Sequence, residues 1–465
     1  MSESSSLKKG LKLRHMTMIS LGGTIGAGLF VGSGAVIATA GPSSIISYLL
    51  AGILVVFIMR MLGEMAVARP ALGSFAQYAR NALGDWAGFS VGWLYWYFWV
   101  IVVSIEATAG AGILQSWFLH DVPLWVLSLI LMVLLTLTNL FSVRSYGEFE
   151  FWFASIKVVA ITLFLIVGAI YILGLWPGTH LSFSNLTTHG GFLPHGASSM
   201  FGSIITAVSA FIGAEIATIA ASESNEPGKS VAKATTSVIW RVLIFYVGSI
   251  FVVVTIVPWS NTDILQSPYV SVMQVLHIPW ISTIMNLIVM TAVLSCLNSG
   301  LYTSSRMLYA LAHKHEAPKK LLNVNRKGVP VIAVLTCTVV SSLSIIMSYT
   351  SPETVFAFLL NSSGVVGLFI YLLIALSQFK LRRKLEQEAP EALKIRMWGY
   401  PYLTILCMLS MAAILVSMAF TSEFRSQLIL SFVSFALILV IYVIRNLIIK
   451  RNGNVPQEID FSAKE

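Results

Sequence analysis

The sequence contains few charged residues for its length. Only 11% of its 465 residues are Asp, Glu, Lys or Arg, whereas soluble domains carry about 25%. Hydrophobic residues make up 57%, and the mean hydropathy is +0.83. This balance excludes an ordinary soluble protein and indicates a chain that crosses the lipid bilayer many times, so its length does not predict a number of domains.

Cysteine is also scarce, and its positions exclude two kinds of site. Cys296, Cys337 and Cys407 all lie within apolar stretches, without the spacing of a metal cluster or of a disulfide framework. The sequence also lacks a nucleophile–base constellation and a phosphate-binding loop. It therefore predicts no enzyme, no catalytic residues, no metal site and no cofactor.

Lys and Arg are nearly absent from alternate connections between the apolar stretches. A membrane helix needs about 20 apolar residues, and twelve stretches qualify: 16–39, 43–67, 86–117, 122–141, 150–174, 198–221, 235–258, 279–312, 329–348, 354–380, 398–420 and 426–448. The six connections predicted outside hold one basic residue, Arg425. Basic loops favour the cytoplasm, so both termini are predicted there, in a multi-pass cell-membrane protein. The net charge of +9 then reflects cytoplasmic loops and not a nucleic-acid partner.

The predicted spans suggest a division of the chain into units. The polar, basic start lacks a signal-cleavage pattern, so we expect a retained first helix after a short tail. The units are a cytoplasmic tail at 1–15, a first five-helix repeat at 16–174, a second repeat at 198–380, helices 11 and 12 at 398–448, and a cytoplasmic tail at 449–465.

Two spans contain glycine-rich interruptions. The first reads GGTIGAGLF from Gly22 to Phe30, and the sixth reads SAFIGAE from Ser209 to Glu215. Glycine weakens a helix, and broken backbone at membrane depth is tolerated only where it is buried in protein or lines a cavity. The two breaks share the pattern x-I-G-A. Because five helices separate the starts of the two units, the second would be inverted relative to the first, as in many transporters.

Broken helices expose main-chain groups that suit a dipolar solute. A half-helix N-terminus carries partial positive charge and binds carboxylates, whereas the carbonyls at a C-terminus suit an ammonium group. Two crossed, broken helices could therefore recognise the zwitterionic part of an amino acid without a charged side chain.

Ionisable residues inside the apolar spans indicate function by default. Lys157 in the fifth span is either a lysine that snorkels to the inner interface or an ammonium group inside the bundle that gains and loses a proton. Glu106 in the third is either a structural partner or a carboxylate facing substrate or carrying protons. Glu215 follows the second break and could bridge helices or relay a proton. Arg60 and Glu64, four residues apart, are predicted to form a local ion pair.

The eighth span carries a long polar face that includes Ser295, Cys296, Asn298 and Ser299. Small and hydroxyl residues allow close helix packing, so this face serves either packing or the lining of a pathway. The aromatic run WLYWYFWV at 93–100 is predicted to serve packing and interfacial anchoring rather than ligand binding.

These features together resemble the amino acid permeases of the amino acid–polyamine–organocation superfamily, and among them bacterial GABA permeases most. The resemblance rests on RHMTMISLGGTIGAGLFVGSG (14–34), GPSSIISYLLAG (41–52), FIMRMLGEMAVARPALGSFAQYA (57–79), GFSVGWLYWYFWV (88–100), GEFEFWFASIKVVAI (147–161) and LNSGLYTSSRMLYALA (297–312). It implies a twelve-helix fold with a five-plus-five inverted repeat, and proton-coupled uptake. It also implies substrate contacts from the unwound segments, at Thr24, Ile25, Gly26, Ala27, Gly28, Ser209, Ala210, Phe211, Ile212 and Gly213. Lys157 matches a lysine of proton-coupled members, and Cys296 lies in a segment that GABA permeases use near the pathway.

The sequence thus predicts a symporter that moves a small zwitterionic amino acid inward with a proton. γ-Aminobutyrate (GABA) or small neutral amino acids are the expected substrates, with Lys157, Glu106 and Glu215 in proton coupling and Ser295, Cys296 and Ser299 along the pathway. The alternatives are an exchanger, a broad-specificity permease, a sodium-driven carrier and, more remotely, a nutrient sensor that binds without transporting.

Overall fold

The computed structural model describes residues 7, 10–117, 119–261, 267–276, 280–351, 363 and 365–451. The regular structure of these residues is helical. They form no β-strand, only one isolated β-bridge between Leu11 and Ser224. Nine helical stretches in this described part are long and apolar enough to cross a membrane, and Gly196–Ala210 is a shorter apolar helix. The all-helical, multi-span architecture expected from the sequence is confirmed at this level.

The helices of the first half follow the predicted spans, with one additional short helix at 75–83 and two differences at the spans themselves. They are α1 (Leu13–Thr24), α2 (Ala27–Phe30), α3 (Ser33–Ala40), α4 (Ser44–Ala68), α5 (Phe75–Leu83), α6 (Asp85–Trp117), α7 (Leu124–Phe141) and α8 (Val143–Ile172). The predicted span 16–39 is divided into three helices. α8 begins seven residues before the predicted start at 150, because the Ser142 hydroxyl caps the helix by accepting a hydrogen bond from the Ser145 amide at 3.0 Å.

The second half contains a second divided span. Its helices are α9 (Gly196–Ala210), α10 (Ile216–Ala220), α11 (Pro227–Lys233), α12 (Ile239–Ile256), α13 (Pro268–Val275), α14 (Ile281–His313), α15 (Val331–Thr350), α17 (Val366–Glu388), α18 (Tyr402–Phe420) and α19 (Ser422–Arg451). The first part of the predicted span 354–380, and most of both predicted tails, lie outside the described residues.

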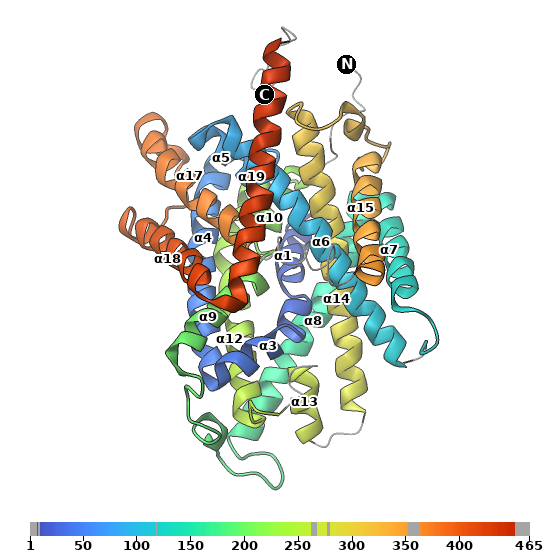
Figure 1. Cartoon of the computed structure of the whole chain (residues 1–465), viewed down its shortest axis with the longest axis vertical. Coiled ribbons are helices and arrows are strands. Elements are labelled where there is room, and N and C mark those ends of the chain that lie inside the picture. Colours follow the sequence, from blue (N-terminus) through green and yellow to red (C-terminus); the bar gives the residue numbers. More distant parts are fainter. Residues whose placement is uncertain are drawn as a thin grey trace.

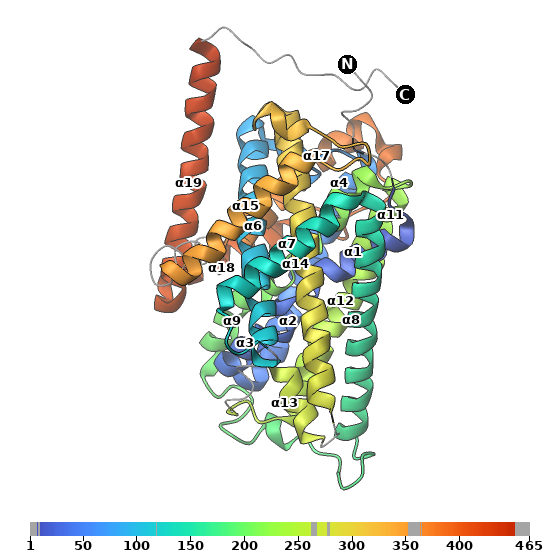
Figure 2. The ribbon, with the colours of Figure 1, turned by 90° about the vertical axis from the view of Figure 1, so that its right-hand side faces the viewer.

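The interior of the bundle is a large apolar core that also holds buried polar and charged side chains, and its outer surface is apolar. α14 runs through its middle beside α6 and α8, whereas α18 and α19 lie at its edge (Figures 1 and 2). α19 exposes a row of large apolar side chains, including Phe432, Leu437, Ile441 and Ile448. Such a surface suits lipid and not water.

The two ends of the bundle differ in charge. The loop that follows α8, residues 175–197, contains no Lys or Arg. It lies at one end of the bundle, and α19 ends with Lys450 and Arg451 at the other (Figure 2). The two faces of α8 differ in exposure. Trp152 and Val159 face outward and are 65% and 57% exposed, while Glu150 and Lys157 face inward and are fully buried. Glu150 and Lys157 are therefore directed into the protein, whereas Arg144 and Glu148, near the start of the helix, are exposed or partly exposed.

Candidate functional site

The first break lies where α1 ends at Thr24 and α2 begins at Ala27. The ammonium group of Lys157, on α8, donates to the carbonyl oxygens of Gly22 at 2.6 Å and Ile25 at 2.7 Å. Lys157 therefore points to the interior and does not snorkel to the surface. Its contacts satisfy carbonyl groups that the end of α1 leaves without helical partners.

The second break separates α9 from α10 over Phe211 to Glu215. Gly213 has φ +118°, a conformation that L-residues with a Cβ rarely adopt. A Cβ on Gly213 would lie 2.2 Å from the carbonyl oxygen of Gly23. The two breaks thus meet through their main chains, at a place where only glycine fits.

Glu215 follows this turn and is fully buried. Its carboxylate accepts hydrogen bonds from the Gly213 amide at 3.1 Å, from the Tyr95 hydroxyl at 2.8 Å and from the Tyr371 hydroxyl at 3.1 Å. Tyr95 belongs to α6 and Tyr371 to α17. Glu215 therefore bridges the second break to two other helices.

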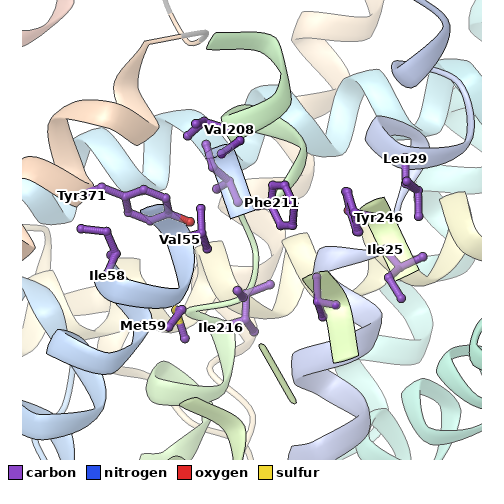
Figure 3. Close-up of a cluster of buried hydrophobic side chains, with 14 of the residues drawn as sticks. Ile25, Leu29, Val55, Ile58, Met59, Val208, Phe211, Ile216, Tyr246 and Tyr371 are labelled. Carbon is purple, nitrogen blue, oxygen red and sulfur yellow. The ribbon is translucent and has the colours of Figure 1, made fainter. Parts of the chain in front are cut away.

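A tyrosine on α12 joins the two breaks to each other. The Tyr246 hydroxyl oxygen lies 2.9 Å from the carbonyl oxygen of Thr24 and 2.7 Å from that of Ala210. Its one proton can be donated to only one of them at a time. Figure 3 shows Tyr246 beside Phe211, and the two rings stack with centroids 4.3 Å apart. The last carbonyls of α1 and α9 therefore share one donor.

A cavity of about 240 Å³ lies between the breaks. Its walls come from the two broken segments and from α6 and α14, and the lining residues are Thr24, Gly26, Gly28, Gly32, Phe98, Trp99, Val102, Ile105, Glu106, Thr206, Ser209, Ala210, Ile212, Cys296 and Ser363. At Gly26 the cavity wall is closely packed: a Cβ there would lie 2.8 Å from Cys296 Sγ and 2.9 Å from Glu106 Oε1. Glycine is required there for the backbone to approach both side chains.

A family model described as "Amino acid permease" matches residues 15–455. The chain belongs to the amino acid permease family. It is 56% identical to the gamma-aminobutyric acid permease of Bacillus subtilis, over 95% of this chain and 94% of the relative. It is 48% identical to the gamma-aminobutyric acid permease of Escherichia coli, over 90% of each chain. It is 39% identical to the aromatic amino acid transport protein AroP of Corynebacterium glutamicum, over 98% of each chain. The resemblance to the superfamily is thereby confirmed, and the protein is a multi-pass membrane transporter and not an enzyme.

The permease brings together most of the residues singled out from its sequence, in two groups. Thr24, Gly26, Gly28, Ser209, Ala210, Ile212, Glu106 and Cys296 line the cavity. Ile25 and Phe211 instead pack in the buried apolar cluster around the breaks (Figure 3), and Gly213 contacts Gly23. The side chain of Ala27 lies outside the described residues.

Ser295 and Ser299 face α8 and do not line this cavity. Ser295 donates to Glu150 Oε1 at 2.5 Å, and Ser299 lies within hydrogen-bond distance of the Tyr146 hydroxyl, at 3.2 Å. Glu150 was not among the predicted site residues, although it stands within the motif GEFEFWFASIKVVAI. A carboxylate near the start of an apolar span was the one signal that could have identified it.

A buried ion pair of the permease, between Glu223 and Arg306, also escaped prediction. Glu223 accepts from Arg306 Nε at 2.9 Å and from the Tyr302 hydroxyl at 3.0 Å, and its carbonyl accepts from the amides of Gly10 and Leu11. This pair holds the start of the described chain against α14. The two partners are 83 residues apart, so no local pattern in the sequence links them.

The predicted ion pair between Arg60 and Glu64 is wrong. Glu64 accepts instead from Arg382 Nη1 at 2.5 Å and from the Met397 amide at 2.5 Å, while Arg60 donates to the carbonyl of Arg396. The long-range partners are buried and fix Glu64 more firmly than an exposed neighbour on the same helix would. Arg382 lies on α17, which continues to Glu388.

Proposed function

We propose that this permease takes up a small zwitterionic amino acid, GABA or a small neutral amino acid, together with a proton. The observation that carries the proposal is the meeting of two broken helices at Gly23 and Gly213 beside a cavity. The names of the relatives at 48–56% identity, both gamma-aminobutyric acid permeases, favour GABA.

Substrate recognition on this proposal is divided between main chain and walls. The first amides of α2, beyond Gly26, receive the carboxylate, and the terminal carbonyls of α1 and α9 receive the ammonium group. Thr24, Gly28, Ser209, Ala210 and Ile212 surround the body of the substrate, with Cys296 on the opposite wall. Ile25, Ala27, Phe211 and Gly213 contribute through their backbone.

Proton coupling is assigned to Lys157. Its ammonium group has three donors, two of which hold the carbonyls of Gly22 and Ile25. Loss of the proton removes the charge from these contacts and weakens them, which releases the end of α1 next to the substrate. Glu106 places a carboxylate in the cavity wall, where it responds to the charge of the substrate, and Glu215 acts by holding the second break in place.

The fold that goes with this function is a twelve-helix, five-plus-five inverted repeat. Segments 16–174 and 198–380 form the repeats, each beginning with a divided helix, and 398–448 adds two peripheral helices. Both termini lie in the cytoplasm, because the basic connections and the basic end of α19 lie on one side.

The test is uptake of labelled GABA by purified permease in proteoliposomes. We expect accumulation with an inward pH gradient, and none with a sodium gradient at equal pH. Lys157→Ala should abolish the response to the pH gradient, while Lys229→Ala, at an exposed lysine, should not. Full gradient-driven uptake by Lys157→Ala would refute the coupling role. Uptake that requires internal amino acid would show an exchanger instead.

A broader substrate range is the second candidate, and a specific feature favours testing it. Phe98 and Trp99 line the cavity, and a relative at 39% identity is named for aromatic amino acid transport. Competition of GABA uptake by alanine and phenylalanine separates the two. Inhibition by phenylalanine as strong as by unlabelled GABA would identify a broad-specificity permease.

A further inference from the structure

Glu150 is a fully buried carboxyl group whose two oxygens differ in their surroundings. Oε1 accepts a hydrogen bond from Ser295 at 2.5 Å. Oε2 has no hydrogen-bond partner among the residues that the structure describes. An ionised carboxylate oxygen buried without a partner is strongly unfavourable, whereas a protonated one is neutral. Oε2 is therefore placed to hold a proton.

The carboxyl group also lies against the segment that Lys157 holds. A Cβ on Gly22 would lie 2.0 Å from Glu150 Oε1, and the carbonyl of the same Gly22 binds Lys157 Nζ. Lys157 follows Glu150 by seven residues on α8, which places both side chains on one face of the helix. An ammonium group and a carboxyl group thus flank one residue of α1.

Lys157 is the charged group that acts on Glu150 among the described residues around it. From its own helix it faces Lys157 and Tyr146, and from α14 it faces the uncharged Ser295, Asn298 and Ser299 and the thiol of Cys296. α7 contributes the uncharged Asn139 to the same polar layer, through hydrogen bonds to Asn298. The other titratable groups on neighbouring helices have other positions: His15 of α1 lies 3.1 Å from Glu148, and Tyr246 of α12 lies between the two breaks. Glu106 of α6 lines the cavity and acts on Lys157 from that side, through its charge, whereas Glu150 acts on Lys157 from within α8.

We infer that Glu150 is the group that receives the proton from Lys157 on its way to the cytoplasm. The inference rests on the proposed proton coupling. An N–H bond at Lys157 Nζ breaks and an O–H bond at Glu150 Oε2 forms, through intervening water, which leaves a neutral amine and a neutral acid. The acid then releases its proton to cytoplasmic water and returns to the carboxylate. Glu150 lies two turns nearer than Lys157 to the start of α8, the end assigned to the cytoplasm, so the direction of transfer fits.

The decisive variant is Glu150→Gln. Glutamine keeps the shape of the side chain and an oxygen that accepts from Ser295, but it cannot bind and release a proton. In proteoliposomes we expect pH-gradient-driven GABA accumulation to fall about tenfold or more, while GABA–GABA counterflow at equal pH stays within about twofold. A pH-sensitive dye inside the vesicles should show the loss of GABA-dependent proton entry. The matched control is Glu148→Gln, two residues away on the partly exposed side of α8, which should retain both activities.

Two results would overturn the inference. One is proton entry and accumulation by Glu150→Gln equal to wild type, and the other is an equal loss of accumulation and counterflow, as for a purely structural residue. If this variant does not fold, Ser295→Ala decides, because it leaves the carboxyl group but removes its hydrogen bond. An unchanged pH profile of uptake in Ser295→Ala would then reject the role. Absence of gradient-driven uptake in the wild type would instead reject the proposed function.

Discussion

Gly213→Ala tests whether the contact between the two breaks is essential for transport. The substitution requires a Cβ at φ +118°, which costs about 1–3 kcal/mol. The new Cβ would lie 2.2 Å from the carbonyl oxygen of Gly23, where an ordinary contact begins at 3.4 Å, so the breaks must separate by about 1 Å. In enzymes, a misplacement of about 1 Å costs on the order of a hundredfold in rate. We expect the uptake rate per unit of substrate concentration to fall by a similar factor.

The assay is initial-rate uptake of labelled GABA over a range of concentrations, together with thermal unfolding of the purified variant. Gly112→Ala is the matched control: Gly112 lies within α6, its new Cβ would meet no atom within 4 Å, and alanine has the higher helix propensity. Uptake by this variant should equal that of wild type. If Gly213→Ala transports within about threefold of wild type and melts at the same temperature, close contact of the two breaks is not needed.

Three further substitutions probe the surroundings of the breaks. Tyr246→Phe removes the donor shared by two buried carbonyls, at a cost of about 1–3 kcal/mol. We expect a lower melting temperature that GABA partly restores. If GABA does not raise the melting temperature of this variant, the substrate ammonium group does not bind at these carbonyls. Gly26→Ala forces its Cβ against Cys296 Sγ and Glu106 Oε1 and should raise the half-saturating concentration for GABA uptake; unchanged affinity would place the substrate elsewhere. Arg382→Ala leaves the buried Glu64 carboxylate without its cation and should destabilise the fold by about 3–5 kcal/mol, as measured by thermal unfolding; equal stability with wild type would show that the pair contributes nothing.

The breaks could be predicted from the sequence because their cause is local. Glycine clusters inside an apolar span weaken the helix wherever the span lies, so the positions of Gly26 and Gly213 followed from composition and spacing alone. Lys157 and Glu215 could be identified for a related reason: a charge in the middle of an apolar run must find a partner inside the protein. Which partner each one finds, two carbonyls for Lys157 and two tyrosines for Glu215, depends on helices far away in the chain.

The residues that sequence reasoning missed are those whose importance depends on packing. Tyr246 stands in an ordinary apolar span, where a tyrosine is typical of a packing residue, and only the crossing of α12 with both breaks gives its hydroxyl two acceptors. Glu150 lay at the very start of its predicted span because Arg144 and Glu148 made the preceding turn look like a loop. The error at Arg60 and Glu64 has the same origin, since the i,i+4 rule considers one helix and neglects competing partners from others.

The main-chain contact between Gly23 and Gly213 has a consequence for how permeases of this family diversify. No side chain stands between the two segments, so mutation to any larger residue can only damage that contact and cannot refine it. On the proposed function, a change of specificity would therefore come from the cavity walls, at positions such as Phe98, Ile212 and Cys296. On the proposed function, main-chain groups hold the zwitterionic part of the substrate while the walls of the cavity contact the rest of it, a division that fits relatives named for GABA and for aromatic amino acids.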